Sequence, residues 1–166
     1  MCRPISGRKR HAGAARVYAV DAGAGQLRGW LRADPRVINL ERTNLAQLDP
    51  HLITEPANLI TMDLSYLAIA DAIGQIDRQM LAPAAQLIAL VKPTFELHAA
   101  TVADQPQQIA TATKTAVRAL EDHGWRMLGQ QPSPILGAKG AVETLLHAAS
   151  ASVCGTTPSS APGSSA

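Results

Sequence analysis

Short apolar runs, each closed by a polar or turn-forming residue, alternate along this chain with segments of helical periodicity. The runs predict buried strands and cover 16–20, 36–40, 58–62 and 86–91. Apolar residues at helical spacing cover 26–33, Ser65 to about Met80, and 105–123. Strand and helix therefore follow one another in turn, which is the order expected of an α/β fold with a mostly parallel, doubly wound sheet.

Two more strands are predicted after the last helix, at 125–129 and 141–147. The region between them holds Pro132, Pro134, Gly137 and Gly140, and it shows no helical periodicity. Strands joined without a crossover helix run in opposite directions. We therefore expect one antiparallel strand near the end of the sheet.

Length and composition fit one folded domain with a tail at each end. Of the 166 residues, 46% are hydrophobic and only 3% aromatic, so the core is built from Ala, Leu, Ile and Val. We expect an irregular basic leader over 1–15, the folded domain over 16–149, and a disordered Ser/Pro/Gly tail over 150–166. The net charge of +2 does not by itself indicate nucleic acid.

The cysteine count and the hydropathy pattern bear on location. Cys2 and Cys154 lie in the two tails, and neither has a metal-ligand companion nearby, so no metal site is predicted. No apolar run approaches the ~18 residues that a membrane span needs. The leader has no apolar segment of the kind found in secretory signals. We expect a soluble cytoplasmic protein.

The stretch from Val17 to Glu41 has the order of a dinucleotide-binding unit. A strand leads to Gly23-x-Gly25, then to a helix and a second strand that ends in an acid. Gly29 comes one residue too late for the third glycine of that pattern. A nicotinamide- or flavin-dependent oxidoreductase is therefore kept only as an alternative.

Charged residues at the ends of apolar strands give the stronger candidate site. Asp63 follows one predicted strand, Lys92 follows the next, and Glu143 lies in the last. Ligands of open α/β sheets gather at the carboxyl ends of the strands, so these side chains can converge. A lysine between two carboxylates could activate a hydroxyl group. The alternative is that they are three unrelated surface charges, or that Asp63 only caps a helix.

Several blocks of sequence, taken in order, resemble one family. They are Arg16-Val17-Tyr18-Ala19-Val20-Asp21 with Gly23-x-Gly25, Leu40-Glu41-Arg42-Thr43-Asn44, Asp63-Leu64-Ser65-Tyr66-Leu67, Val91-Lys92-Pro93-x-Phe95-Glu96, and Gly137-x-x-Gly140-x-x-Glu143. Together they are similar to the haemolysin A-type (TlyA-like) ribosomal RNA 2′-O-methyltransferases, relatives of the FtsJ-like enzymes. The resemblance covers about Gly13 to Ala148.

This resemblance implies a Rossmann-like fold that uses S-adenosylmethionine and methylates a ribose 2′-hydroxyl of ribosomal RNA. Asp63, Lys92 and Glu143 match three members of the family's Lys-Asp-Lys-Glu catalytic set. The residues that match the cofactor pocket are Asp21, Gly23, Glu41 and Asp63. The implied partner is ribosomal RNA or a ribosomal subunit, with no role for a membrane.

The sequence departs from the family pattern at its beginning. The S4-type RNA-binding domain, the first strand with its Gly-rich loop, and the first catalytic lysine are not found in it. In this fold the first strand lies in the middle of the sheet, between two strands that would otherwise lose a partner. We interpret the sequence as a truncated copy, either completed by another chain or a non-catalytic remnant. Membrane lysis is disfavoured, because no basic amphipathic helix is found.

Overall fold

The computed structural model describes residues 13–99 and 105–151. The strands are β1 Val17–Asp21, β2 Val37–Glu41, β3 Ala57–Met62, β4 Leu81–Val91, β5 Trp125–Pro132 and β6 Thr144–Ser150. The α-helices are α2 Gly29–Arg32, α3 Ile69–Ala72, α4 Pro93–Glu96 and α5 Pro106–Asp122. Short 3-10 turns are η1 Leu45–Gln47, η2 Pro50–Leu52, η3 Ile73–Gln75, η4 Arg78–Met80 and η5 Ala138–Gly140.

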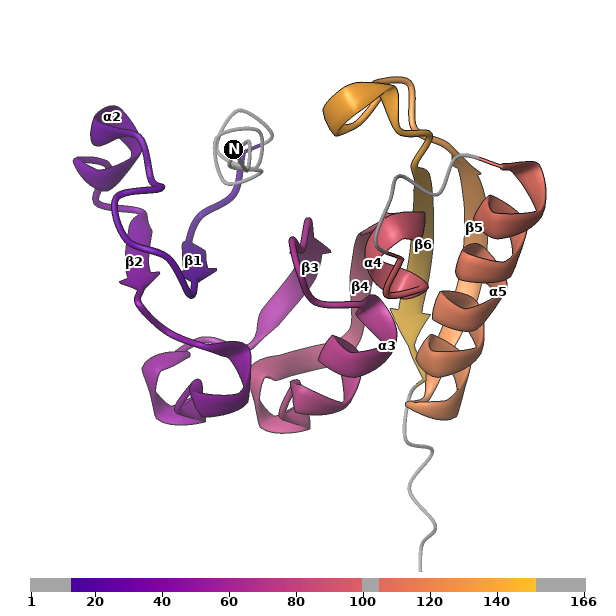
Figure 1. Ribbon diagram of the computed structural model, residues 1–166. Helices are drawn as coiled ribbons and strands as arrows, with labels where there is room; N and C mark the ends of the chain where they lie inside the picture. Colours follow the sequence, from indigo (N-terminus) through magenta and orange to yellow (C-terminus); the bar gives the residue numbers. More distant parts are fainter. Residues whose placement is uncertain (1–12, 100–104, 152–166) are drawn as a thin grey trace, which may run out of the picture.

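The strands form two separate sheets (Figure 1). Strands β1 and β2 make a parallel pair, and the other four have the order β3-β4-β6-β5. Strand β3 is parallel to β4, whereas β6 is antiparallel to both β4 and β5. The expected α/β fold with one antiparallel strand near the end is confirmed, and the antiparallel strand is the last one.

The break between the two sheets falls at the place where the family resemblance implies a further strand. Within the described residues, β1 pairs only with β2, and β3 pairs only with β4. Polar contacts link β1 to the segment just before β3: the Tyr18 hydroxyl lies 3.0 Å from Thr54 Oγ1 and accepts from Glu55 N at 3.1 Å. Arg16 forms an ion pair with Glu55 at 3.0 Å. Within 13–99 and 105–151, side-chain contacts connect the two sheets, and no strand of one sheet pairs with a strand of the other.

The main core lies between helices α3 and α5 and one face of the four-stranded sheet. Side chains alternate along a strand, so Leu87, Ala89 and Val91 of β4 point into this core and are fully buried. The core cluster has twelve buried residues, from Met62 on β3 to Ala148 on β6. The two-stranded sheet has a smaller cluster of four: Val17, Leu27, Leu31 and Val37.

The predicted helix from Ser65 to about Met80 is wrong. The structure instead has α3, η3 and η4 in succession, interrupted where Ile76 adopts extended geometry (φ −85°, ψ 113°). Asp77 then caps η4 by accepting from Gln79 N at 2.8 Å. Helix α3 begins only after Ala68, because Tyr66 has a positive φ of 69°, which a helix does not allow. The helical spacing of Ile69, Ile73 and Ile76 arises because successive short turns pack these side chains against the same core.

Other boundaries also move. Helix α2 is shorter than the expected 26–33. Strand β4 begins at Leu81, before the predicted start at Gln86, and contains an irregularity at Pro83 and Ala84 (φ 56°). In the register, Leu81 pairs with Ala57 and Gln86 with Leu59. The segment 94–104, predicted as a loop, begins within the one-turn helix α4. The predicted strand 141–147 starts at Thr144, so Glu143 precedes it.

Helix α5 is the best-predicted element. It spans Pro106–Asp122, with proline in its first turn, as expected from 105–123. Gln105 and Gln108 form a reciprocal capping box at its start. The leader before Gly13, the tail from residue 152, Cys2 and Cys154 lie outside the described residues. No helix within 13–99 and 105–151 is long and apolar enough to cross a membrane.

Candidate functional site

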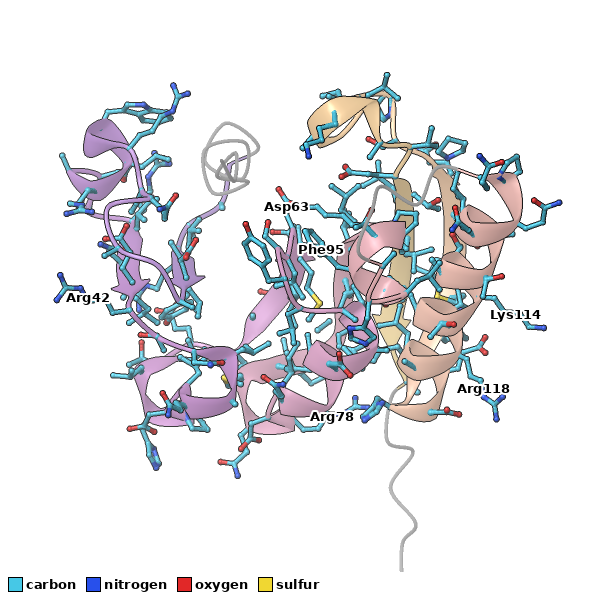
Figure 2. All side chains as sticks on the ribbon, in the orientation of Figure 1. Arg42, Asp63, Arg78, Phe95, Lys114 and Arg118 are labelled. Atoms are coloured by element: carbon cyan, nitrogen blue, oxygen red, sulfur yellow. The ribbon has the colours of Figure 1, made fainter. Side chains whose placement is uncertain are left out.

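The three charged residues predicted in strands or at their ends come together at one edge of the four-stranded sheet. Asp63 follows β3, Lys92 follows β4, and Glu143 precedes β6, whose first residue, Thr144, pairs with Val91. Because β6 runs antiparallel to β4, its beginning lies beside the end of β4. Lys92 Nζ lies 2.6 Å from Asp63 Oδ1, and both side chains are largely shielded. Figure 2 shows Asp63 and Phe95 close together at this edge.

Glu143 completes the cluster and is the most buried of the three, at 8% exposed. Burial raises the pKa of its carboxyl, the positive charge of Lys92 opposes this, and the charge of Asp63 adds to it. The loop before β6 fixes the position of Glu143, since Ser133 N donates to its carbonyl oxygen at 2.8 Å. Gly137 lies against the carboxylate, where a Cβ atom would overlap Glu143 Oε1. The roles predicted for Asp63, Lys92 and Glu143 stay predictions.

Two aromatic rings border this cluster, and the sequence reasoning did not assign them a role. Lys92 Nζ lies 6.0 Å from the centre of the Phe95 ring, and the Phe95 and Tyr66 rings are 5.4 Å apart. Tyr66 is 92% exposed, although it is one of few aromatic residues in the chain. The sequence did contain a signal for this role of Tyr66: it lies three residues after Asp63, in a chain with only 3% aromatic residues.

The predicted cofactor residues Asp21, Gly23 and Glu41 lie together on the two-stranded sheet. Asp21 Oδ1 accepts from Gly23 N at 2.7 Å, and Glu41 Oε1 accepts from Leu27 N at 2.9 Å. Glu41 Oε2 accepts from Arg32 at 2.6 Å and from Asn39 Nδ2 at 3.1 Å. Hydrogen bonds, first of all from Leu27 N, lower the pKa of Glu41 to about 2. These contacts hold the loop after β1 against the end of β2.

These residues fit an adenosyl cofactor only in part. A Cβ at Gly23 would come within 3.1 Å of Asp21 Oδ1 and 3.3 Å of Gln26 Cγ, so glycine lets this loop stay close to the carboxylate. Asp21 Oδ2 and the carboxylate of Asp63 are acceptors suited to ribose or amino groups. Glu41 uses both oxygens within the chain, so its contribution is to hold the loop. The described residues contain no group of three or more His, Cys, Asp or Glu side chains that could hold a metal ion.

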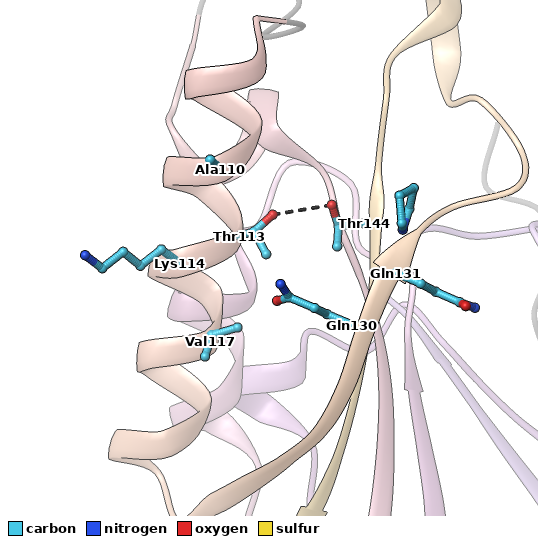
Figure 3. A pocket seen from close by; sticks show the side chains of 8 residues that line it. Ala110, Thr113, Lys114, Val117, Gln130, Gln131 and Thr144 are labelled. Atoms are coloured by element: carbon cyan, nitrogen blue, oxygen red, sulfur yellow. Dashed lines mark hydrogen bonds between the residues drawn. The ribbon is translucent and has the colours of Figure 1, made fainter.

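A cavity of about 470 Å³ lies between α5 and the ends of β5 and β6 (Figure 3). The Thr113 hydroxyl donates to Thr144 Oγ1 at 3.3 Å beside it. Lys114 is the one charged side chain in its lining, which is Ala110, Thr113, Lys114, Val117, Gln130, Gln131, Pro132 and Thr144. We assign this cavity no part in the chemistry, because its lining has no acidic or basic side chain that could act together with Lys114.

Comparison with known proteins places this geometry in context. The model of the FtsJ-like methyltransferase family matches residues 8–150. The 16S/23S rRNA (cytidine-2′-O)-methyltransferase TlyA of Mycobacterium tuberculosis is 37% identical over 143 residues, which are 81% of this chain and 52% of that protein. Bacillus subtilis YqxC, described as an rRNA methyltransferase, is 35% identical over 81% of this chain and 50% of its own length. The chain thus spans about half the length of these relatives.

Solved structures agree with this grouping. A Streptococcus thermophilus protein described as a hemolysin superposes with a TM-score of 0.77 at 30% identity, over 86% of this chain and 53% of that one. The N-methyltransferase NodS of Bradyrhizobium japonicum, solved with S-adenosyl-L-homocysteine, has a TM-score of 0.59 at 14% identity, over 87% of this chain and 71% of its own. The second likeness concerns the fold alone.

Proposed function

The chain belongs to the FtsJ-like methyltransferase family, and on that premise we propose that it carries the catalytic part of an S-adenosylmethionine-dependent methyltransferase acting on a ribose 2′-hydroxyl of ribosomal RNA. The observation that carries the proposal is the cluster of Asp63, Lys92 and Glu143, with Lys92 Nζ 2.6 Å from Asp63 Oδ1. A cation paired with Asp63 at the carboxyl ends of β3 and β4, with the Glu143 carboxylate near enough to feel its charge, suits activation of a hydroxyl group.

Each member of the cluster has a distinct task in this proposal. The Asp63 carboxylate fixes the Lys92 ammonium group, which stabilises negative charge as it develops on the ribose oxygen. Glu143 is the group that accepts the hydroxyl proton, since burial raises the pKa of its carboxyl and so makes the carboxylate a stronger base. The proton thus moves from the 2′-oxygen to a Glu143 carboxylate oxygen.

The cofactor would be held by residues of both sheets. S-adenosylmethionine supplies the electrophilic methyl group when bound. Asp21, with Gly23 shaping its loop, would accept from the ribose hydroxyls, and Glu41 keeps that loop in place through Leu27 N. Asp63 lies at the end of β3, where it could meet both the cofactor and Lys92.

The RNA substrate and the cellular setting are also part of the proposal. The exposed Tyr66 ring, tilted against Phe95 beside Lys92, offers a surface on which an unstacked base could rest. Such a substrate implies a cytoplasmic protein that meets ribosomal RNA or a ribosomal subunit. The chain would work together with a further segment that supplies the missing N-terminal strand of the family pattern.

A second candidate has its own supporting observation. The sheet is divided between β1 and β3, so the predicted cofactor residues Asp21 and Asp63 belong to different sheets. A chain in this state could keep the fold without binding the cofactor, and would then be a non-catalytic remnant of the family.

Thermal unfolding with and without S-adenosylhomocysteine separates the two candidates, because a ligand that binds only the native state raises the melting temperature. A shift of several degrees supports the methyltransferase. Lys92→Met should then lower the formation of 2′-O-methylribose in ribosomal RNA by about 100-fold, as expected for loss of a group that acts in the transition state. Lys114→Met, which changes an exposed lysine on α5, should leave the rate unchanged. No shift, or an equal rate in Lys92→Met, contradicts the proposal.

A further inference from the structure

Segment 63–69 carries Asp63 and Tyr66 from the end of β3 to the start of α3, and its residues before Ile69 lie in neither helix nor strand. Tyr66 has a positive φ of 69°, a conformation that a residue with a Cβ atom keeps only when its surroundings impose it. The Tyr66 side chain is 92% exposed, so its own burial does not supply that constraint. Contacts of the other residues in the segment must supply it.

Three contacts join this segment to α4, and they follow the same order along both. They are Asp63 with Lys92, the Tyr66 ring with the Phe95 ring, and the Ile69 amide with Glu96. Within α4, the Lys92 carbonyl oxygen accepts from Glu96 N at 3.1 Å, so Lys92 and Glu96 belong to one helical turn. Residues four apart lie on the same face of a helix. The first and the third contact therefore meet one short element of the fold.

The third contact takes the place of a cap within the segment. A Ser, Thr, Asp or Asn at the cap position of α3 would satisfy one of the first helical amides locally. The cap position holds Ala68, which makes no side-chain cap bond, and Glu96 Oε1 accepts from Ile69 N at 2.7 Å. A cap supplied by α4 also fixes how far segment 63–69 lies from α4, which a local cap would not do.

The hydrogen bond from Ile69 N to Glu96 is well shielded, because Glu96 is only 7% exposed. Burial raises the pKa of the Glu96 carboxyl, whereas the amides of Ile69 and Ala70 favour its charged form. A hydrogen bond removed from water is stronger electrostatically than an exposed one. Glu96 is thus the firm link between two elements whose other contacts include the exposed Tyr66 ring.

We propose that Glu96 is a positioning residue for the site at this edge of the sheet: it holds segment 63–69 against α4, and so keeps Asp63 on Lys92 and Tyr66 on Phe95. Its meaning for catalysis rests on the function proposed above. The positioning itself needs neither cofactor nor RNA, so it can be tested on the chain alone.

Phe95 provides the reporter for this test, because it is the one phenylalanine of the 166-residue chain. Chain labelled with 4-fluorophenylalanine therefore gives one fluorine NMR signal. The two ring centres are 5.4 Å apart, so Tyr66→Leu should move this signal, and the size of that shift reports the contact. Tyr66→Leu is then repeated in chains that carry a second substitution. Comparing shifts within each background removes the direct effect of that second substitution on the label.

In the Glu96→Ala background, Tyr66→Leu should move the signal much less than in the wild type, because Tyr66 has already left Phe95. The Glu96→Gln background keeps an acceptor oxygen for Ile69 N and should show the full shift. Asp34→Ala is the matched control. Asp34 is also a buried carboxylate, 8% exposed, that accepts from a backbone amide (Arg36 N, 3.0 Å), but in the two-stranded sheet. Its background should show the full shift.

Methyl transfer gives a second readout. Glu96→Ala should lower kcat by about tenfold or more, since displacements near 1 Å have effects of this order. Glu96→Gln should restore most of kcat. Adding Glu96→Ala to Lys92→Met should lower kcat little further, because Glu96 acts through the Asp63–Lys92 pair. A wild type that transfers no methyl group contradicts the proposed function, and the fluorine experiment then decides this inference by itself.

Three results would overturn the proposal. One is an equal effect of Tyr66→Leu in the wild type and in Glu96→Ala. Another is a Glu96→Gln background that behaves as Glu96→Ala does. The third is loss of the shift in Asp34→Ala as well, which would assign the effect to general loosening of the chain. If Glu96→Ala shows no cooperative unfolding transition, Glu96→Asp replaces it with the same expectations, because its carboxylate is one methylene group shorter.

Discussion

The position of the Glu143 carboxylate depends on the lack of a side chain at Gly137. Gly137 has φ −71°, which alanine also adopts, so Gly137→Ala introduces no backbone strain. The new Cβ would overlap Glu143 Oε1 and displace the carboxylate from its present position in the cluster. We expect methyl transfer to fall by about 100-fold, because displacements near 1 Å have effects of that size.

The matched control for Gly137→Ala is Gly129→Ala in β5, where a Cβ would have no heavy atom within 4 Å. Both variants should unfold cooperatively, and only Gly137→Ala should lose activity. Equal activity in the two variants would show that the carboxylate of Glu143 is not needed near Lys92.

A second prediction concerns Glu41 and the stability of the fold at acid pH. The hydrogen bond from Leu27 N and that from Asn39 lower the pKa of Glu41 from 4.5 to about 2 in the folded chain. The carboxylate therefore stabilises the fold fully above pH 4.5, and this contribution is lost as the pH falls towards 2. In urea unfolding between about pH 6 and pH 2, Glu41→Gln should lose less stability on acidification than the wild type does. Parallel curves would mean that these hydrogen bonds do not persist in solution.

Among the elements, helix α3 depends on a residue 27 positions away. Glu96 in α4 is 7% exposed, and its Oε1 accepts from Ile69 N, the first helical amide of α3, at 2.7 Å. In Glu96→Ala the buried amide loses its acceptor, which should lower the free energy of unfolding by about 1–3 kcal/mol. Glu96→Gln keeps an acceptor oxygen at the same place, so it should retain most of this stability near neutral pH.

The stabilities of the wild type and the Glu96→Gln variant should also depend differently on pH. Burial raises the pKa of Glu96, so the unfolded chain releases this proton at lower pH than the folded chain does. Stability from this group is present below pH 4.5 and is lost as the pH rises through the raised value. Urea unfolding as a function of pH should show this loss in the wild type and not in Glu96→Gln. The same loss in both would assign the pH dependence to other groups.

How far the elements could be predicted depends on how local their signals are. Helix α5 is predicted almost to the residue, because its first-turn proline, its apolar stripe and the glycine just past its end are all local signals. The pattern from Ser65 to about Met80 predicts one helix where the structure has separate turns, because the boundaries of these turns depend on Glu96 and on the positive φ of Tyr66. The convergence of Asp63, Lys92 and Glu143 was predictable from strand order. The role of Gly137 behind Glu143 was not, because it depends on the path of the loop.

At the scale of the whole molecule, the division of the sheet separates two hydrophobic clusters of unequal size. The two-stranded sheet has a cluster of only four buried residues, whereas the four-stranded sheet shares a core of twelve with its helices. A two-stranded sheet by itself is marginally stable at best in water. The same division separates Asp21 from Asp63, so cofactor binding and the integrity of the sheet are expected to change together.

This division predicts unequal opening of the two sheets in native-state hydrogen exchange. Amides of β1 and β2 should exchange through openings of lower free energy than those of β4 and β6, because fewer buried contacts must be broken. Tyr18→Phe removes the hydroxyl that meets Thr54 Oγ1 and Glu55 N, and so should lower the opening free energy of β1 and β2 further. Tyr66→Phe, a change of the same kind on an exposed ring, should leave every strand unaffected. If all strands open with one common free energy, the polar contacts at Tyr18 join the two sheets as firmly as a shared strand would, and the cofactor residues on β1 are then already held in fixed relation to Asp63.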